Sequence, residues 1–275
     1  MPRIDELLCF PVKGCGPVVL AESGIGPAGL HHDRSFMVVD ADGVFRSQRD
    51  TPQLAVIRPE ITAAGRRLRL WTPGGGSAEI VVRTVGERCR VELLGTAYTG
   101  LDQGDEVARW LSAVVGAPSR LVRVPPDHAR RTDGHTQGTT GYADSSAVLV
   151  ASRASLIDLA RRMAERGRTP VPISRFRPNI VLADDREPYA EDRMRALAVG
   201  EAELGYAKPA IRCAVTTVDQ ATGVKTGPEP LATLAGYRRA ERGGVAFGAK
   251  FAVTVPGKVS VGDEVTVTAW GPAEI

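Results

Sequence analysis

Several features that identify large classes of protein are missing from this 275-residue sequence. No apolar run approaches the roughly 20 residues of a membrane-spanning helix, and the N-terminus lacks the long apolar core of a secretory signal. A cytoplasmic protein without a membrane partner is therefore expected. The net charge of +3, from 35 basic and 32 acidic side chains, is also too small to indicate binding to nucleic acid.

Cysteine is scarce, and its spacing excludes several kinds of site. No C-x-x-C pair occurs, which disfavours a disulfide framework and a structural zinc site. The C-x₄-C-x₂-C run of a plant-type iron–sulfur cluster is absent, so no such cluster is expected in this chain. No G-x-G-x-x-G opens a helix, which disfavours a doubly wound dinucleotide fold. The cysteines are Cys9, Cys15, Cys89 and Cys213.

Short strand-forming segments joined by Gly- and Asp-containing turns dominate what is present. The segment CAVTTVD, residues 213–219, is expected to be one of these strands, and alternation in KVSVGDEVTV predicts a hairpin that turns at residues 262–263. Helical spacing predicts helices in GDEVARWLSAVVG, with a cap at Asp105, in ASRASLIDLARRMAERG, and in PLATLAGYRRA. We therefore predict a mainly β (α+β) fold with a few peripheral helices.

A polar segment containing Pro and Gly, residues 124–146, divides the chain. Segments of this composition are either connections between domains or functional loops. We predict a small N-terminal barrel or sandwich domain over residues 1–123 and a second domain over residues 124–275.

Cys213 stands out because it directly follows Arg212 in a strand-forming run. A cysteine in a strand is most often a small buried apolar residue. A neighbouring guanidinium, however, favours the thiolate, which is both a nucleophile and a soft metal ligand. The residues alone leave both interpretations open.

Basic and polar residues at turn-like positions suggest an anion site. Lys13 in FPVKG and Arg34 in HHDR are ordinarily interpreted as solvated surface charges. Arg177 and Asn179 directly precede the apolar strand IVLA, where they could bind a phosphate or a heteroaromatic edge. Residues 144–146, Asp-Ser-Ser, form either a local turn or a cluster of donors for an anion.

Other kinds of site have less support. Adjacent histidines in a strand point to opposite faces, so a metal shared within residues 31–33 is disfavoured. No G-x-S-x-G elbow supports a serine hydrolase. A Cys–His hydrolase would need a histidine to reach Cys213, and this alternative stays open for His31, His32, His128 and His135.

Six segments, in this order along the chain, are similar to one family. They are FPVKGCGPVVL, GLHHDRSFMVVDADGVFRSQRDTPQLAVI, RFRPNIVL, PYAEDRM, IRCAVTTVDQATGVKTGPEPLATLAGYR and FGAKFAVTVPGKVSVGDEV. Together they resemble the MOSC proteins that carry an N-terminal β-barrel domain, such as the mitochondrial amidoxime reducing component and bacterial YcbX-type proteins. The resemblance covers nearly the whole chain and implies a small β-barrel domain followed by a MOSC β-barrel domain.

The resemblance also implies a molybdenum cofactor, a pterin dithiolene with a phosphate, held between the two domains. The family's metal ligand falls on Cys213, which is therefore the expected catalytic centre. One protein thiolate is sufficient, because the dithiolene and oxo groups supply the other ligands. The family's cofactor contacts fall on Lys13, Gly14, Arg34, Ser145, Ser146, Arg177, Asn179, Arg212 and Lys250.

Two of these positions depart from the family pattern. Gly14 stands where serine is common, and Lys250 stands where some relatives have tyrosine. The remaining residue types suit the cofactor, since Arg and Lys bind phosphate and Asn binds pterin edges.

The resemblance implies an oxidoreductase that reduces small N-hydroxylated compounds by oxygen-atom transfer. Electrons are expected from a separate ferredoxin-like or cytochrome b5-like protein with its reductase, because the chain has no cluster motif. A sulfur carrier or sulfurtransferase with a persulfide on Cys213 is an alternative, and a non-enzymatic carrier of the molybdenum cofactor is another. Asp192 is a candidate proton donor, although its ordinary interpretation is structural.

Overall fold

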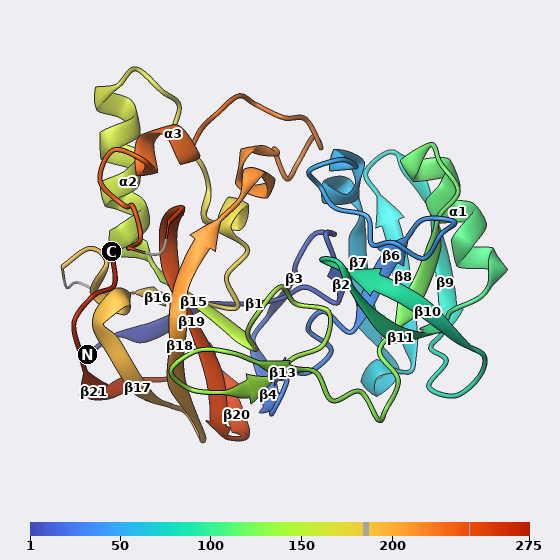
Figure 1. Ribbon diagram of the computed structural model, residues 1–275, viewed down its shortest axis with the longest axis horizontal. Helices are drawn as coiled ribbons and strands as arrows, with labels where there is room; N and C mark the ends of the chain where they lie inside the picture. The colour runs from blue at the N-terminus through green and yellow to red at the C-terminus, as the bar shows by residue number, and fades with distance from the viewer. Residues whose placement is uncertain (184–186, 242) are drawn as a thin grey trace.

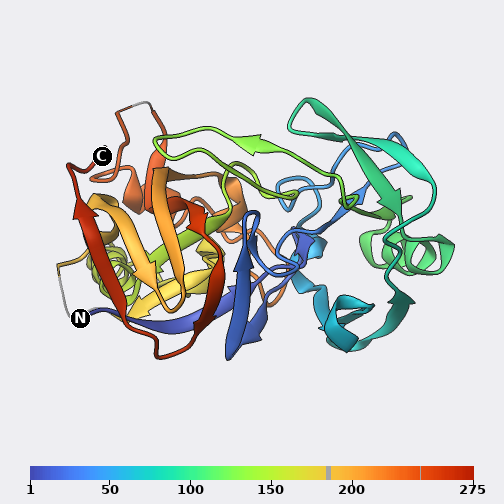
Figure 2. The same ribbon diagram turned by 90° about the horizontal axis from the view of Figure 1, so that it is seen from below.

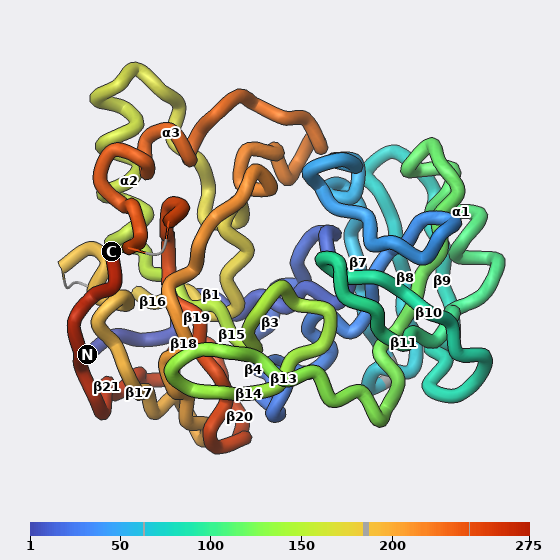
Figure 3. Tube along the Cα trace, viewed as in Figure 1, coloured from blue at the N-terminus to red at the C-terminus, as the bar shows by residue number. Residues whose placement is uncertain are grey.

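Two lobes lie side by side in the computed structural model, which describes residues 1–183, 187–241 and 243–275 (Figure 1). Strands form most of both lobes, and the α-helices lie at their outer faces (Figures 1 and 2). Both chain ends lie in the same lobe, as the backbone trace shows (Figure 3). The predicted mainly β (α+β) fold is confirmed. Among the described residues, no helix is both long enough and apolar enough to cross a bilayer.

The C-terminal lobe is built on one large sheet with the strand order β21-β17-β18-β19-β15-β16-β1-β3. Neighbouring strands pair antiparallel, except for the parallel pair β15 and β16. The first strands of the chain thus complete a sheet formed mainly by its second half. The strands are β1 (Arg3–Cys9), β3 (Val18–Leu20), β15 (Val148–Ser152), β16 (Ile180–Ala183), β17 (Met194–Val199), β18 (Ala202–Arg212), β19 (Val245–Val255) and β21 (Val265–Trp270).

The N-terminal lobe contains a sheet with the order β10-β11-β12-β6-β2 and a second sheet with the order β7-β8-β9. Apolar side chains of both sheets and of helix α1 form one buried cluster. The strands are β2 (Val12–Lys13), β6 (Phe36–Val39), β7 (Arg58–Thr62), β8 (Arg67–Thr72), β9 (Gly75–Val81), β10 (Arg88–Leu93), β11 (Thr96–Asp102) and β12 (Arg120–Arg123). Two further sheets are small. One has the strand order β20 (Gly257–Ser260), β4 (Glu22–Gly26) and β5 (Gly29–Leu30), and the other pairs β13 (Arg131–Thr132) with β14 (Gly138–Thr139).

The chain passes between the lobes several times, and these crossings position the site. After β1 in the large sheet, β2 joins the N-terminal lobe, and β3 returns to the large sheet. A turn at residues 31–34 then leads from β5 to β6 in the N-terminal lobe. The last crossing runs from β12 to β15 and contains the segment 124–146, at which we propose the division into two domains.

The helices form where apolar spacing predicted them, but one cap differs. Helix α1 (Asp105–Val115) begins after Gly104, whose φ of 100° favours glycine, so Asp105 is the first helical residue and not the cap. Helix α2 (Arg153–Glu165) begins at Ser152, whose side chain accepts a hydrogen bond from the backbone of Ser155. The remaining helices are short: α3 (Leu231–Leu234), η1 (Pro52–Val56), η2 (Ala63–Gly65), η3 (Ile173–Phe176), η4 (Ala190–Arg193) and η5 (Ala214–Thr217).

Two strand predictions are wrong. Residues 213–219 do not continue a strand, because β18 ends at Arg212, which pairs with Val245, the first residue of its partner strand β19. The 3-10 helix η5 follows instead. The segment around residues 262–263 does turn, but it does not form a hairpin, since β20 pairs with β4 and β21 pairs with β17.

Packing beneath the large sheet fixes the segment that leads into the site. Leu159 and Met163 of α2 are buried in one cluster with Phe176 and Phe247. The rings of Phe176 and Phe247 stack with centroids 3.9 Å apart, so the end of η3 is held against β19.

Candidate functional site

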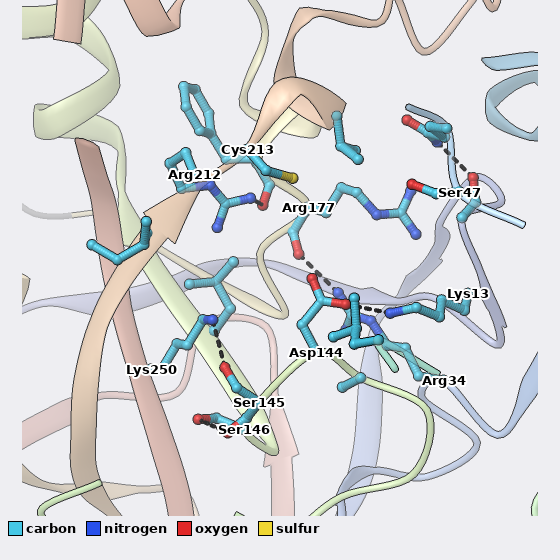
Figure 4. A pocket seen from close by; sticks show the side chains of 18 of the residues that line it. Lys13, Arg34, Ser47, Asp144, Ser145, Ser146, Arg177, Arg212, Cys213 and Lys250 are labelled. Carbon is cyan, nitrogen blue, oxygen red and sulfur yellow. Dashed lines mark hydrogen bonds and ion pairs between the residues drawn. The ribbon is translucent and has the colours of Figure 1, made fainter. Parts of the chain in front are cut away.

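A cavity of about 280 Å³ lies between the lobes, and all ten residues predicted from the sequence line it. Figure 4 labels these residues except Gly14 and Asn179. They come from both lobes and from distant parts of the chain. These ten are Lys13, Gly14, Arg34, Ser145, Ser146, Arg177, Asn179, Arg212, Cys213 and Lys250.

The thiol of Cys213 is exposed, which removes the interpretation of this cysteine as a buried apolar residue. It lies between the end of β18 and η5, and Figure 4 shows its sulfur on the same side of the cavity as Arg212 and Arg177. Cys9 and Cys15 are buried by contrast. Among the described residues, none of the four histidines lines the cavity, which leaves the Cys–His hydrolase alternative without a base beside the thiol.

Arg34 is held by a network that joins the lobes. Its Nη1 donates to Asn179 Oδ1 over 3.0 Å, and its Nη2 donates to the carbonyl of Arg177 over 3.1 Å. It also forms an ion pair with the buried carboxylate of Asp33. The guanidinium groups of Arg34 and Arg177 lie 4.4 and 4.2 Å from the ring centroid of Phe10, so one buried aromatic ring holds both cations.

The backbone at both arginines is in the left-handed region, with φ of 46° at Arg34 and 56° at Arg177. This conformation costs a non-glycine residue roughly 1–3 kcal/mol and persists only where surrounding contacts impose it. Arg177 Nη1 donates to the carbonyl of Cys15 over 2.6 Å, which ties this arginine to the opposite lobe. Sequence patterns could not show that these two side chains converge.

Asn179 lines the cavity, and its side-chain amide is bonded to other parts of the protein. Its side chain is buried, and its Oδ1 accepts from the backbone of Leu149 over 3.1 Å as well as from Arg34. Its Nδ2 donates to the carbonyl of Leu8 over 3.1 Å. We infer that Asn179 fixes Arg34 rather than presenting a free amide to a ligand.

Lys250 and Arg212 reach the cavity from the neighbouring strands β19 and β18. Lys250 Nζ donates to Ser145 Oγ over 2.7 Å. Arg212 Nη2 donates to the carbonyl of Phe176 over 2.7 Å, whereas its buried Nε has no hydrogen-bond partner within the described part of the chain. Arg212 therefore adds a buried, incompletely bonded cation to the cavity lining, and this charge favours an anionic ligand.

Positive charge in the cavity is poorly balanced. The lining contains Lys13, Arg34, Arg46, Arg49, Arg177, Arg212 and Lys250, against one carboxylate, Asp144. Lys13 pairs with Asp144 and holds the pKa of that carboxyl well below its usual range, although the Asp144 side chain is 60% exposed. Such an excess of cations fits a ligand with several negative charges.

Burial and like charge alter the pKa values of these cations. Burial lowers the pKa of Lys13, Arg177 and Arg212. Burial, followed by repulsion from Arg212, lowers the pKa of Lys250 to about 8. Each shift means that the protein disfavours the charged form, so a bound anion would relieve the repulsion.

Gly14 occupies a position that a serine would strain. Its φ is 84°, and a Cβ added there would lie 3.1 Å from Leu54 Cδ1. The departure from the family's serine therefore agrees with the local backbone.

Sequence reasoning missed the segment between β6 and η1, residues 45–49. Phe45, Arg46, Ser47, Gln48 and Arg49 all line the cavity. The two arginines in RSQRD were a possible signal in the sequence. In the structure Val44 and Phe45 form only isolated bridges, and Gln48 contacts Gln220 of the opposite lobe.

Sequence reasoning also missed Arg130, which shapes the loop before β15. Its guanidinium donates to the carbonyls of Gly141 and Ala143, and over 2.7 Å to that of Asp144. Asp192, by contrast, lies outside the cavity lining: it is buried and pairs with Arg238. Burial raises the pKa of Asp192 to about 7, but its place supports a structural role.

The residues present fit the implied cofactor. One exposed thiol can act as a soft metal ligand, and cations from both lobes surround it. Lys13, Arg34 and Arg177 could hold a phosphate, while Ser145, Ser146 and the lining backbone offer donors and acceptors to a heteroaromatic ring.

Comparison with known families gives two adjacent matches. The family described as MOSC N-terminal beta barrel domain matches residues 1–118, and the MOSC domain matches residues 137–266. Mitochondrial amidoxime-reducing component 1 of Homo sapiens is 32% identical over 95% of this chain and 82% of its own length. Molybdenum cofactor sulfurase of Danio rerio is 31% identical over 89% of this chain, which spans only 31% of that sulfurase. Among solved structures, the YUAD protein from Bacillus subtilis aligns over 96% of this chain and 94% of its own, at 10% identity and a TM-score of 0.44.

The charge imbalance predicts that ligand-free protein binds small polyanions. Pyrophosphate should raise its melting temperature, because a ligand that binds only the folded state stabilises it. Arg177→Gln should weaken pyrophosphate binding about 10- to 100-fold, the effect of losing one charge-assisted hydrogen bond. Arg109→Gln, at an exposed position of α1 outside the cavity, is the control. An equal loss in both variants would contradict the assignment of Arg177 to the anion site.

The lowered pKa of Lys250 predicts a pH dependence of stability. Between about pH 8 and its ordinary value of 10.5, the unfolded chain binds this proton more tightly than the folded chain does. The free energy of unfolding of ligand-free wild type should therefore rise with pH in this window relative to that of Lys250→Gln. Urea titrations at several pH values measure this difference, and a constant difference across the window would show that Lys250 is not destabilised as a cation.

Proposed function

The chain belongs to the MOSC proteins with an N-terminal β-barrel domain, and from this membership we propose that it is a molybdenum-cofactor oxidoreductase that reduces N-hydroxylated compounds. The membership itself, and the names of the relatives, support a function related to the molybdenum cofactor. The observation that carries the finer proposal is an exposed thiol, Cys213, inside an interlobe cavity with a large excess of positive charge.

In this proposal the residues have distinct tasks. Cys213 provides the protein ligand to the metal, and Lys13, Arg34 and Arg177 hold the phosphate. Arg212 contributes a further cation to the wall that faces the anionic ligand. Asn179 keeps Arg34 in place, and the network around Phe10 keeps both arginines directed into the cavity.

When bound, the cofactor supplies two-electron oxygen-atom transfer, which turns an N-hydroxyl compound, two electrons and two protons into the N–H compound and water. The chain's own residues bind and orient the substrate. Phe45, Leu94 and Ile211 give part of the lining an apolar character that suits the carbon body of a small substrate. The hydrogen bond from Lys250 Nζ to Ser145 Oγ holds a proton inside the cavity.

Electrons reach the site, in this proposal, from a separate ferredoxin-like or cytochrome b5-like protein with its reductase. A chemically reduced viologen replaces that donor in a first assay with a simple amidoxime. Formation of the amidine by loaded protein supports a reductase, and full cofactor loading without turnover supports a carrier of the cofactor.

A second candidate function is sulfur transfer. The exposed thiol of Cys213 and the similarity to a molybdenum cofactor sulfurase favour it. In this case Cys213 would carry a persulfide whose outer sulfur passes to an acceptor.

Replacing the thiol tests the ligand assignment. Cys213→Ser should lose nearly all molybdenum, measured as metal per chain after purification from a cofactor-competent host, while the melting temperature stays close to that of wild type. Cys89→Ser, at a half-buried cysteine in β10, should keep its metal. Normal metal content and turnover in Cys213→Ser would remove Cys213 from the metal site.

Cyanide separates the two functions. A reductase should show pterin-linked molybdenum and no cyanide-labile sulfur on Cys213, since the thiolate is occupied by the metal. The opposite result is that cyanide releases thiocyanate from metal-free wild type and none from Cys213→Ser. That result would show that Cys213 carries a persulfide and would support the sulfur-transfer function. The colorimetric thiocyanate assay and metal analysis are made on the same preparation.

A further inference from the structure

A pair of buried glutamines joins the two lobes beside the cavity. Gln48 Nε2 donates to Gln220 Oε1 over 3.1 Å, and Gln220 Nε2 donates to Gln48 Oε1 over 2.9 Å. The two residues are 1% and 7% exposed. A reciprocal amide pair fixes both side chains, because each amide supplies a donor and an acceptor to the other.

Each end of this pair is anchored to a segment that lines the cavity. Gln48 Nε2 also donates to the carbonyl of Gly14 over 2.5 Å, directly after Lys13. Gln220 Nε2 also donates to the carbonyl of Val218 over 3.0 Å, in the segment that follows η5. The pair therefore connects the segment that contains Lys13 and Gly14 to the segment that begins at Cys213.

Two further interactions strengthen the same connection. Arg58 Nη2, from the N-terminal lobe, donates to the carbonyl of Gln220 over 2.8 Å. Arg175 ties the segment to the C-terminal lobe: its Nη2 donates to Asp219 Oδ2 over 3.0 Å and its Nη1 donates to the carbonyl of Thr216 over 3.3 Å. The segment 213–220 is thus held from both sides.

Gln220 differs in one respect from the side chains of two other interlobe contacts. The ion pair of Lys13 with Asp144 and the bond from Arg177 to Cys15 use side chains that face the ligand space. Gln48 lines the cavity, whereas Gln220 does not, so Gln220 connects the lobes without offering a group to the ligand. Its effect on a ligand can therefore be separated from direct binding.

We propose that the Gln48–Gln220 pair is a clasp that keeps the lobes closed over the cavity and holds the Cys213 segment in place, and so slows the release of a bound anionic pterin. The clasp rests on the proposed function only in the identity of the ligand. Gln48 and Gln220 are positioning residues, and they act through the backbone of Gly14 and of residues 213–220. Breaking one or two neutral hydrogen bonds corresponds to roughly a tenfold change in the lobe-opening equilibrium.

Amide hydrogen exchange of the ligand-free chain tests the clasp without any cofactor. Gln220→Leu and Gln48→Leu should each speed exchange about tenfold in residues 213–223, and the double variant should exceed either single variant only slightly, because both remove the same interaction. Gln103→Leu is the matched control. Gln103 is equally buried and bonds through its amide to Arg83 and Leu101, but only within the N-terminal lobe.

The second measurement is pterin release from loaded protein under dialysis. Gln220→Leu should release pterin about tenfold faster than wild type, whereas Gln103→Leu should release it at the wild-type rate even if its melting temperature falls. If Gln220→Leu does not fold, Gln220→Glu keeps the shape and removes the donor to Gln48 and Val218.

The outcomes separate the clasp from the proposed function. Unchanged exchange in residues 213–223, or equal changes in the Gln103 control, would overturn the clasp. Faster exchange with unchanged pterin release would also overturn it, because the pair would then not hold the ligand. A wild-type chain that takes up no pterin overturns the proposed function, while the exchange measurement still decides whether the pair joins the lobes.

Discussion

Positive charge accumulates around one interlobe cavity, and the surrounding contacts must hold these cations in place. Arginine and lysine side chains that face each other across a partly buried space repel, and burial adds to the cost. The chain tolerates this repulsion because other contacts hold the cationic side chains in place. The guanidinium groups of Arg34 and Arg177 both lie over the ring of Phe10, and Arg34 also donates a hydrogen bond to Asn179. The side chains are thus held in place while their positive charge is not fully neutralised by nearby carboxylates. This excess of positive charge favours the binding of an anionic ligand.

The path of the chain explains why these side chains meet. The chain passes between the lobes near Lys13, in the turn that contains Arg34, and again before Ser145, so each passage leaves polar residues at the junction. Cys213 reaches the cavity in another way. It lies between the end of β18, where pairing with β19 stops, and the start of η5. A strand end at a lobe boundary leaves the thiol exposed, whereas a continued strand would have buried or paired it.

Ten residues of the cavity lining could be predicted from the sequence, but residues 45–49 and the reasons for the placement could not. Resemblance identified Lys13, Arg177 and Cys213, and apolar spacing located α1 and α2. Local alternation failed at residues 257–270, because it indicates strands without indicating which sheet each one joins. The interactions of Arg130 and Gln48 could not be predicted from the sequence either, because their partners are distant in sequence and come close only in the folded chain.

In the proposed function, the sulfur of Cys213 binds molybdenum within this cavity. A crystal structure of the loaded protein, with anomalous scattering recorded at the molybdenum edge, tests it most directly. We expect a metal peak at bonding distance from Cys213 Sγ, with the pterin phosphate among Lys13, Arg34 and Arg177. A metal peak elsewhere, or a free Cys213 thiol in fully loaded protein, would contradict it.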